Sequence, residues 1–195
     1  FIQTICFAIG QDTSGPENFS PAAASHPVRD REQIVAAGYY LPETDIIGHN
    51  DGEDGGPILA WRDPHIFEDE DGVIHAFWSA KVAPRIPAVA HAILEVDGDT
   101  VSIASLEPPI LLPDVADYTQ AEVPKINKDP ISGTYYMLIA ACDRLHERQP
   151  DTELIKETRL YKSPSLRGPW ETYAPDTSRL NGTQDLFGGS ITHMD

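Results

Sequence analysis

The feature that most constrains the fold is a series of short strand-like segments bounded by turn signals. Residues 73–79 follow an Asp-Gly pair, residues 89–96 precede one, and residues 134–141 follow a glycine. Segments rich in β-branched and aromatic residues, separated by Asp, Gly and Pro, are typical of antiparallel hairpins. Helix signals are few: residues 29–37 could form a turn or two, and residues 145–157 a loop or a short helix. We therefore expect an all-β protein.

Part of this pattern repeats along the chain. Residues 5–12, 89–97 and 158–163 each begin as a strand-like segment and are followed by a segment with a proline or an aromatic residue. The spacing is roughly that of the four-stranded blades of a β-propeller with insertions in their loops. A β-propeller is therefore the expected architecture, and a β-sandwich is the alternative.

The charge of the chain limits its partners. Across 195 residues, Lys and Arg total 14 and Asp and Glu total 31, which gives a formal net charge of -17. A surface this acidic repels phosphate backbones and anionic lipid headgroups, so we expect neither a nucleic-acid nor a membrane partner. No apolar stretch approaches the ~20 residues that a spanning helix needs. A neutral or weakly charged substrate fits this composition better.

Metal and cofactor signals are weak. Cys6 and Cys142 form neither a CxxC pair nor a zinc-ligand spacing, and a disulfide between them is left open. The seven histidines form no HExxH or HxH pattern. The acidic stretch 51–55 lacks the spaced ligands of an EF-hand. We therefore expect no metal and no cofactor.

Two carboxylates stand out because each lies just before a proline at the start of an apolar strand. Asp63 belongs to the stretch Trp61-Arg62-Asp63-Pro64-His65, and Glu122 lies two residues before Pro124. Proline removes a backbone N–H and biases the preceding residue toward an extended conformation. Asp63 is thus expected at the first residue of a strand, and Glu122 at the equivalent position of the next blade. Carboxylates at equivalent strand starts of adjacent blades converge near the centre of a propeller.

These residues resemble the active site of the five-bladed propeller glycosidases: glycoside hydrolase family 68, the invertase and fructanase family 32, and the arabinan-degrading family 43. The stretch 61–69 is most similar to family 68, the levansucrase, inulosucrase and β-fructofuranosidase family, and so is the stretch 161–170. The resemblance covers roughly residues 39–195 and implies that Asp63 stabilises the transition state and that Glu122 is the general acid/base. Val123 stands where the family usually has arginine.

The resemblance also implies a domain organisation. Residues 1–195 would be a partial catalytic propeller domain of roughly two to three blades, with blades missing on both sides. The family nucleophile is an aspartate beside a tryptophan on the first blade. None of the three tryptophans here has that context, so we expect the nucleophile upstream of Phe1.

The chemistry explains why carboxylates are needed. Glycoside cleavage passes through an oxocarbenium-like state, in which a protonated carboxyl delivers a proton to the leaving oxygen and a second carboxylate attacks the anomeric carbon in the retaining case. Glu122 would supply the proton, Asp63 would accept hydrogen bonds from ring hydroxyls, and Arg62 would hold a hydroxyl or a neighbouring carboxylate in fixed geometry. Trp61 and His65 are further candidates for substrate contacts.

The expected function is that of a glycoside hydrolase or fructosyltransferase acting on sucrose or fructans by a retaining mechanism. The expected partner is a small carbohydrate, and the 195-residue piece by itself is expected to be inactive. By family resemblance the protein would be secreted or periplasmic, although the chain carries no signal-peptide pattern. Two alternatives stay open: an inverting arabinofuranosidase or xylosidase of the family 43 type, and a non-catalytic carbohydrate-binding propeller.

Overall fold

Strands dominate the computed structural model of the chain, which describes residues 2–9, 22–43, 47, 58–184 and 186–192. The described strands are β1 (Ile5–Phe7), β2 (Ala22–Ser25), β3 (Arg62–Glu68), β4 (Ile74–Ala83), β5 (Ile86–Asp97), β6 (Thr100–Leu106), β7 (Gln120–Lys128), β8 (Tyr135–Cys142), β9 (Lys156–Ser163) and β10 (Glu171–Thr172). One short helix, α1 (Arg31–Ala36), and two 3-10 turns, η2 (Val115–Asp117) and η3 (Asp151–Glu153), complete the described elements. The expected all-β class is confirmed.

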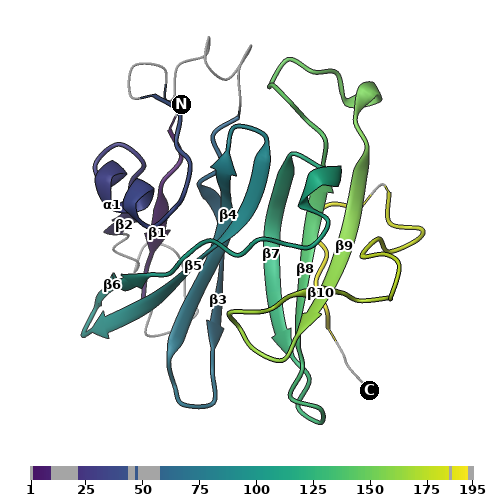
Figure 1. Cartoon of the computed structure of the whole chain (residues 1–195). Coiled ribbons are helices and arrows are strands. Elements are labelled where there is room, and N and C mark those ends of the chain that lie inside the picture. The colour runs from purple at the N-terminus through teal and green to yellow at the C-terminus, as the bar shows by residue number, and fades with distance from the viewer. Residues whose placement is uncertain (1, 10–21, 44–46, 48–57, 185, 193–195) are drawn as a thin grey trace.

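The strands form three antiparallel sheets. Strands β3 to β6 pair in chain order as one four-stranded sheet, which we call sheet I, and β7 to β10 form a second, sheet II. Strands β1 and β2 pair separately. Sheets I and II stand side by side, and β7 is the edge of sheet II that faces sheet I (Figure 1). Four-stranded antiparallel sheets joined in series are consistent with propeller blades.

Sheet I is packed on both faces, as the side-chain alternation along β4 shows. Trp78 points into a core shared with β1 and α1, which also contains Ile5 and Ile34. Its neighbour Phe77 points to the opposite face, into a core shared with sheet II that includes Met137. Because successive side chains of a strand point to opposite faces, a strand that is apolar at every position must be covered on both sides. Sheet I therefore lies between two layers.

The hairpins expected from the turn signals are present, with longer strands than the sequence suggested. The segment expected at 73–79 extends to Ala83 in β4, and the segment at 89–96 lies within β5. Residues 89–97 and 158–163 both occupy the third strand of their sheet, as a blade-like repeat requires. Of the stretch 5–12, residues 5–7 form β1, and residues 10–12 lie outside the described part of the chain.

Two further expectations concern cysteines and membranes. Cys6 is an exposed free thiol and Cys142 a buried one, so the disulfide that the sequence left open is not formed. Within the described residues, no helix has the length and apolar character needed to cross a bilayer.

Candidate functional site

The first strand of each four-stranded sheet carries the same irregularity. The pairing of β3 with β4 shifts between Arg62 and His65, and the pairing of β7 with β8 shifts between Glu122 and Lys125. The residue inside each bulge has a positive φ, 60° at Asp63 and 49° at Val123, in the left-handed region that residues other than glycine seldom adopt. Pro64 follows Asp63, and Pro124 follows Val123. Proline has no backbone N–H to donate to the neighbouring strand, so it is tolerated at such bulges.

The repeated bulge corrects the expected equivalence between the two carboxylates. Arg62 pairs with Ser79 immediately before the first bulge, and Glu122 pairs with Ala140 immediately before the second. Glu122 thus matches Arg62, and Val123 matches Asp63. The prediction that Glu122 occupies the position of Asp63 is wrong by one residue, because Asp63 lies one residue before its proline and Glu122 two. Asp63 is also the second residue of β3, not its first.

This register places Arg62 and Glu122 opposite each other across the junction of the two sheets. Nη2 of Arg62 donates to Oε1 of Glu122 at 2.7 Å, and Nη1 of Arg62 donates to the carbonyl of Leu59 at 2.7 Å. Nε of Arg62 lies 3.7 Å from Oδ2 of Asp63. The guanidinium therefore contacts both carboxylates, with side chains that are 15% exposed for Arg62, 18% for Glu122 and 27% for Asp63.

Asp63 is oriented by donors from both sheets. The buried hydroxyl of Ser79 donates to Oδ2 of Asp63 at 3.1 Å, and the backbone N–H of Val123 donates to the same oxygen at 3.3 Å. The second donor belongs to the residue with the left-handed backbone in the bulge of β7. Strained backbone of this kind is concentrated at functional sites, where the surrounding structure maintains it. The carboxylate of Asp63 is therefore held in place before any ligand arrives.

Two further side chains, Cys142 and Lys81, interact with Glu122. Sγ of Cys142 lies 3.9 Å from Oε2 of Glu122, and burial raises the pKa of the Cys142 thiol. Lys81 is 2% exposed, and its ammonium donates to the carbonyl of Pro84 at 3.0 Å. Burial lowers the pKa of Lys81 to about 8, and the charge of Arg62 contributes to this lowering, whereas Glu122 acts in the opposite direction.

The other two residues expected to contact substrate lie elsewhere. Trp61 is 0% exposed, and its Nε1 donates to the hydroxyl of Ser25 at 3.0 Å within the core of sheet I. A fully enclosed indole cannot stack on a sugar, so the structure gives Trp61 a packing role. His65 is half-buried, and its Nε2 lies 3.1 Å from the carbonyl of Ile126. His65 thus bridges β3 and the backbone of β7, and burial lowers its pKa.

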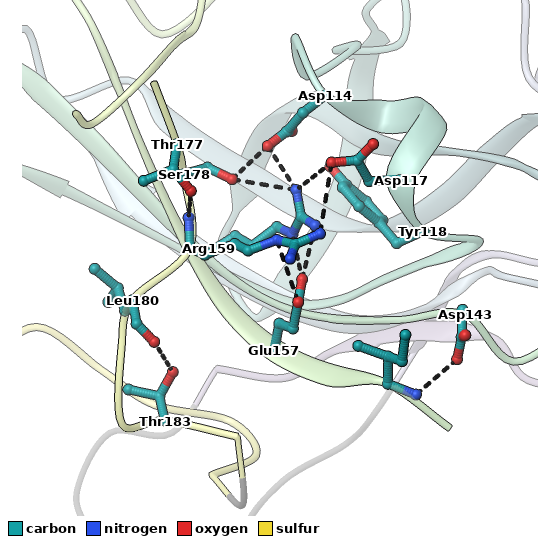
Figure 2. Close-up of polar contacts among 12 residues, drawn as sticks. Asp114, Asp117, Tyr118, Asp143, Glu157, Arg159, Thr177, Ser178, Leu180 and Thr183 are labelled. Atoms are coloured by element: carbon teal, nitrogen blue, oxygen red, sulfur yellow. Dashed lines mark hydrogen bonds and ion pairs between the residues drawn. The ribbon is translucent and has the colours of Figure 1, made fainter. Parts of the chain in front are cut away.

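A second polar cluster, which the sequence did not predict, joins β9 of sheet II to the segments before β7 and after β10 (Figure 2). Arg159 is 1% exposed and donates to Oδ2 of Asp114 at 2.6 Å and to Oε2 of Glu157 at 2.7 Å. Its guanidinium also lies 4.7 Å from the ring centre of Tyr118. Burial by itself lowers the pKa of Arg159, but Glu157 and Asp114 raise it above its usual range. The one signal available in the sequence was an arginine between a threonine and a leucine in a strand-like segment.

Two pockets meet at Glu122. One is lined by Arg62, Gln120, Glu122 and Arg144, and the other runs along the ends of β7, β8 and β9. Glu122 and Arg144 line both. Glu122 thus lies at the boundary of the two pockets. If one part of a ligand occupies each pocket, the carboxyl of Glu122 can transfer a proton to the atom that joins the two parts. Among the described residues, no group of His, Cys, Asp and Glu is arranged to hold a metal ion.

No protein-family model matches the chain, and no curated protein matches it. Among solved structures, the chain is similar to an inulosucrase from Halalkalicoccus jeotgali bound to kestose, with 18% identity and a TM-score of 0.49. The match covers 92% of this chain and 41% of that chain, so this chain spans about two fifths of its length. At this identity and TM-score, the likeness adds no functional statement about this chain.

Proposed function

We propose that the chain is part of a propeller glycosidase or fructosyltransferase that acts on sucrose or fructans with retention of configuration. The observation that carries this proposal is the contact of Arg62 with both Asp63 and Glu122 at the bulged starts of β3 and β7. Two carboxylates on adjacent first strands, held by one guanidinium, match the residues and order of the motif that resembles family 68.

The proposed chemistry follows from the two carboxylates. Glu122 donates its proton to the glycosidic oxygen as the bond to the anomeric carbon breaks and its electron pair passes to that oxygen. A carboxylate nucleophile forms the glycosyl-enzyme, and Glu122 then takes a proton from the water or sugar hydroxyl that attacks it. Asp63 accepts hydrogen bonds from ring hydroxyls, which strengthen as positive charge develops on the ring.

The rest of the proposal concerns the whole protein. We place the nucleophile outside residues 1–195, which form part of a five-bladed catalytic domain, and we expect the protein to be secreted or periplasmic. The formal charge of -17 is compatible with a neutral substrate such as sucrose. The proposed retaining mechanism uses three carboxylates. In this proposal the chain supplies two of them, Asp63 and Glu122.

The test uses the full-length protein and three variants assayed for sucrose turnover. Glu122→Gln removes the transferable proton and keeps the side-chain shape, and we expect kcat to fall by about 10²–10⁴-fold. Asp63→Asn removes the charge that faces the ring and should abolish turnover with little change in melting temperature. Glu153→Gln is the matched control, because Glu153 is an exposed carboxylate in η3, between β8 and β9. It should behave as wild type.

The outcomes separate the proposed enzyme from its alternatives. Near-normal turnover by the Glu122→Gln variant would overturn the assignment of the acid. Saturable sugar binding without turnover by wild-type protein would favour a non-catalytic binding propeller. If turnover occurs, proton NMR of the first product gives the anomeric configuration, and inversion would favour the arabinofuranosidase or xylosidase alternative.

A further inference from the structure

A turn in the segment after β10 contains Asn181 and Gly182, which form the only Asn-Gly pair in the sequence. Both residues are exposed, and Gly182 has a φ of 78°. Apart from its chain neighbours, a Cβ added to Gly182 would meet nothing within 4 Å. The surroundings of Gly182 are therefore open, and no Cβ shields its backbone nitrogen.

The hydrogen bonds around this turn are made by its flanking residues. Leu180 donates its N–H to the carbonyl of Thr158 at 2.9 Å, and the hydroxyl of Thr183 donates to the carbonyl of Leu180 at 2.6 Å (Figure 2). Within the described part of the chain, no acceptor takes the N–H of Gly182. The amide at the centre of the turn thus has no hydrogen bond that would hold its proton or its orientation.

An asparagine followed by an unshielded amide has a chemical consequence, since asparagine is one of the thermally labile residues of proteins. Hydroxide removes the proton of the Gly182 N–H, and the electron pair of this nitrogen forms a bond to Cγ of Asn181. The bond from Cγ to Nδ2 breaks, and Nδ2 leaves as ammonia with a proton from water. The product is a cyclic imide. Glycine favours this closure because it has no Cβ and the widest backbone freedom.

Water then opens the imide. It adds to one of the two ring carbonyl carbons and breaks the bond from that carbon to the nitrogen of Gly182, which takes up a proton. Opening at Cγ gives aspartate with the main chain restored. Opening at the other carbonyl gives isoaspartate, in which the main chain runs through Cβ of residue 181. The sum of the steps exchanges an amide and water for a carboxyl group and ammonia.

The turn lies between two attachments of the chain to sheet II. The first is the bond from Leu180 to β9. At the second, a Cβ added to Gly188 would lie 3.9 Å from Cγ1 of Val123, and one added to Gly189 would lie 3.3 Å from Cδ2 of Leu138. Both glycines therefore pack closely on β7 and β8. Isoaspartate adds one main-chain atom and a negative charge between these attachments, so the chain between them must shift.

We infer that Asn181 is a site of spontaneous deamidation, which proceeds through a cyclic imide with Gly182 and gives isoaspartate as well as aspartate. The reaction needs only water and hydroxide, and it does not depend on the proposed function. The isoaspartate form loosens the packing of Gly188 and Gly189 on sheet II, whereas the aspartate form keeps it.

The test is peptide mass spectrometry of the full-length protein during storage in native buffer, at neutral and at mildly alkaline pH. The peptide that contains Asn181 should gain the mass that separates a carboxyl group from a carboxamide, and faster at the higher pH. Isoaspartyl methyltransferase, which methylates isoaspartate and not ordinary aspartate, should label the product. Asn127 is the internal control, because it lies in β7, pairs with Tyr136 and precedes Lys128. Its peptide should stay unchanged.

Three variants test the route and the consequence. Asn181→Gln requires a larger ring, and Gly182→Ala places a Cβ beside the attacking nitrogen, so both should deamidate several-fold more slowly at residue 181. Asn181→Asp supplies the aspartate product directly. Freshly prepared Asn181→Asp should match wild type in hydrogen exchange at residues 186–189, whereas stored protein that the methyltransferase labels should exchange faster there.

Three results would count against the inference. Equal rates at Asn181 and Asn127 in the folded protein would overturn it, because the turn would then give no special access. Equal rates in wild type and Gly182→Ala would overturn the route through the imide. Unchanged hydrogen exchange at residues 186–189 in isoaspartate-containing protein would overturn the loosening of the packing.

Discussion

Nη2 of Arg62 donates to Oε1 of Glu122 at 2.7 Å and so joins the first strands of sheets I and II at their bulges. The same guanidinium donates to the carbonyl of Leu59 at 2.7 Å and lies 3.7 Å from Asp63. A planar fork can satisfy these acceptors together, whereas a lysine ammonium is a single point charge on a flexible stem. Arg62 therefore sets the orientation of Glu122 relative to Asp63.

The first prediction is that Arg62→Lys lowers kcat for sucrose by about 10²-fold, because a misplaced acid costs rate even when charge is kept. The melting temperature should change little, because Glu122 keeps a cationic neighbour. Arg167→Lys is the control, since Arg167 is 66% exposed and pairs with Glu107. Steady-state kinetics of both variants would check this, and a kcat within a few-fold of wild type would contradict it.

The second prediction concerns the strained backbone at Val123. At an ordinary strand position, glycine is less stable than alanine by roughly 0.5–1 kcal/mol. At a φ of 49° this order should invert, because the left-handed conformation costs a residue with a Cβ about 1–2 kcal/mol. Val123→Gly should therefore be more stable than Val123→Ala by about 1 kcal/mol. Urea unfolding of the two variants measures this difference, and Ala more stable than Gly would show that the position is unstrained.

The third prediction concerns the buried amine of Lys81. Burial lowers its pKa from 10.5 to about 8, so the folded protein binds fewer protons than the unfolded chain between these values. Stability should therefore rise with pH from about 8 to 10.5, and below 8 the buried charge reduces stability. Lys81→Met removes this cost and should stabilise the protein at pH 7.

Melting curves at several pH values give the test for Lys81. The stabilisation by Lys81→Met should shrink as pH rises through 10.5, because above that value the wild-type amine is neutral in both states. The control is Lys162→Met, because Lys162 lies on β9 and is only half-buried. A Lys81→Met variant that is less stable than wild type at pH 7 would show that the bond from Lys81 to Pro84 outweighs the desolvation of the charge.

The sequence predicted the strands and marked Asp63 and Glu122 as candidate residues because these signals are local. Alternating or continuous apolar runs and turn residues mark the strands, and a proline after Asp63 marks the break in β3. The register of β7 could not be predicted in the same way. It depends on a bulge at Val123, a β-branched residue that seldom has a positive φ.

The cluster around Arg159 was not predictable for a different reason. Asp114, Glu157 and Ser178 come from separate segments, and no spacing rule links them. Trp61 illustrates the opposite error, since its place beside the Arg62-Asp63-Pro64 motif suggested a sugar contact, whereas the fold buries it. Whether a tryptophan faces a pocket or a core depends on which neighbouring layer covers the strand.

The fourth prediction starts from a pair of histidines buried in sheet I. Nδ1 of His75 lies 2.9 Å from Nε2 of His91, and Nε2 of His75 lies 3.2 Å from Asp69. His91 is 1% exposed and stacks on Phe77 at a ring-centre distance of 4.6 Å. Burial, together with the neighbouring charge of His75, lowers the pKa of His91 from 6.5 to about 4. The two rings therefore pack as a pair in which His91 stays neutral.

Because the folded pKa of His91 lies below the unfolded value, its contribution to stability is complete above about pH 6.5 and is lost as pH falls toward 4. His91→Gln keeps a hydrogen-bonding group toward His75. We expect this variant to lose less free energy of unfolding than wild type as pH falls from about 6.5 to 4. His65, whose pKa is also lowered by burial, contributes a smaller slope in the same window, so His65→Gln is the comparison. Asp69, whose pKa is lowered from 3.8 by its bond to His75, contributes mainly below about pH 5 and so overlaps only the acid end of this window. Denaturant unfolding at half-unit pH steps measures the slope, and an unchanged slope in His91→Gln would show that the pair accepts a proton without loss of stability.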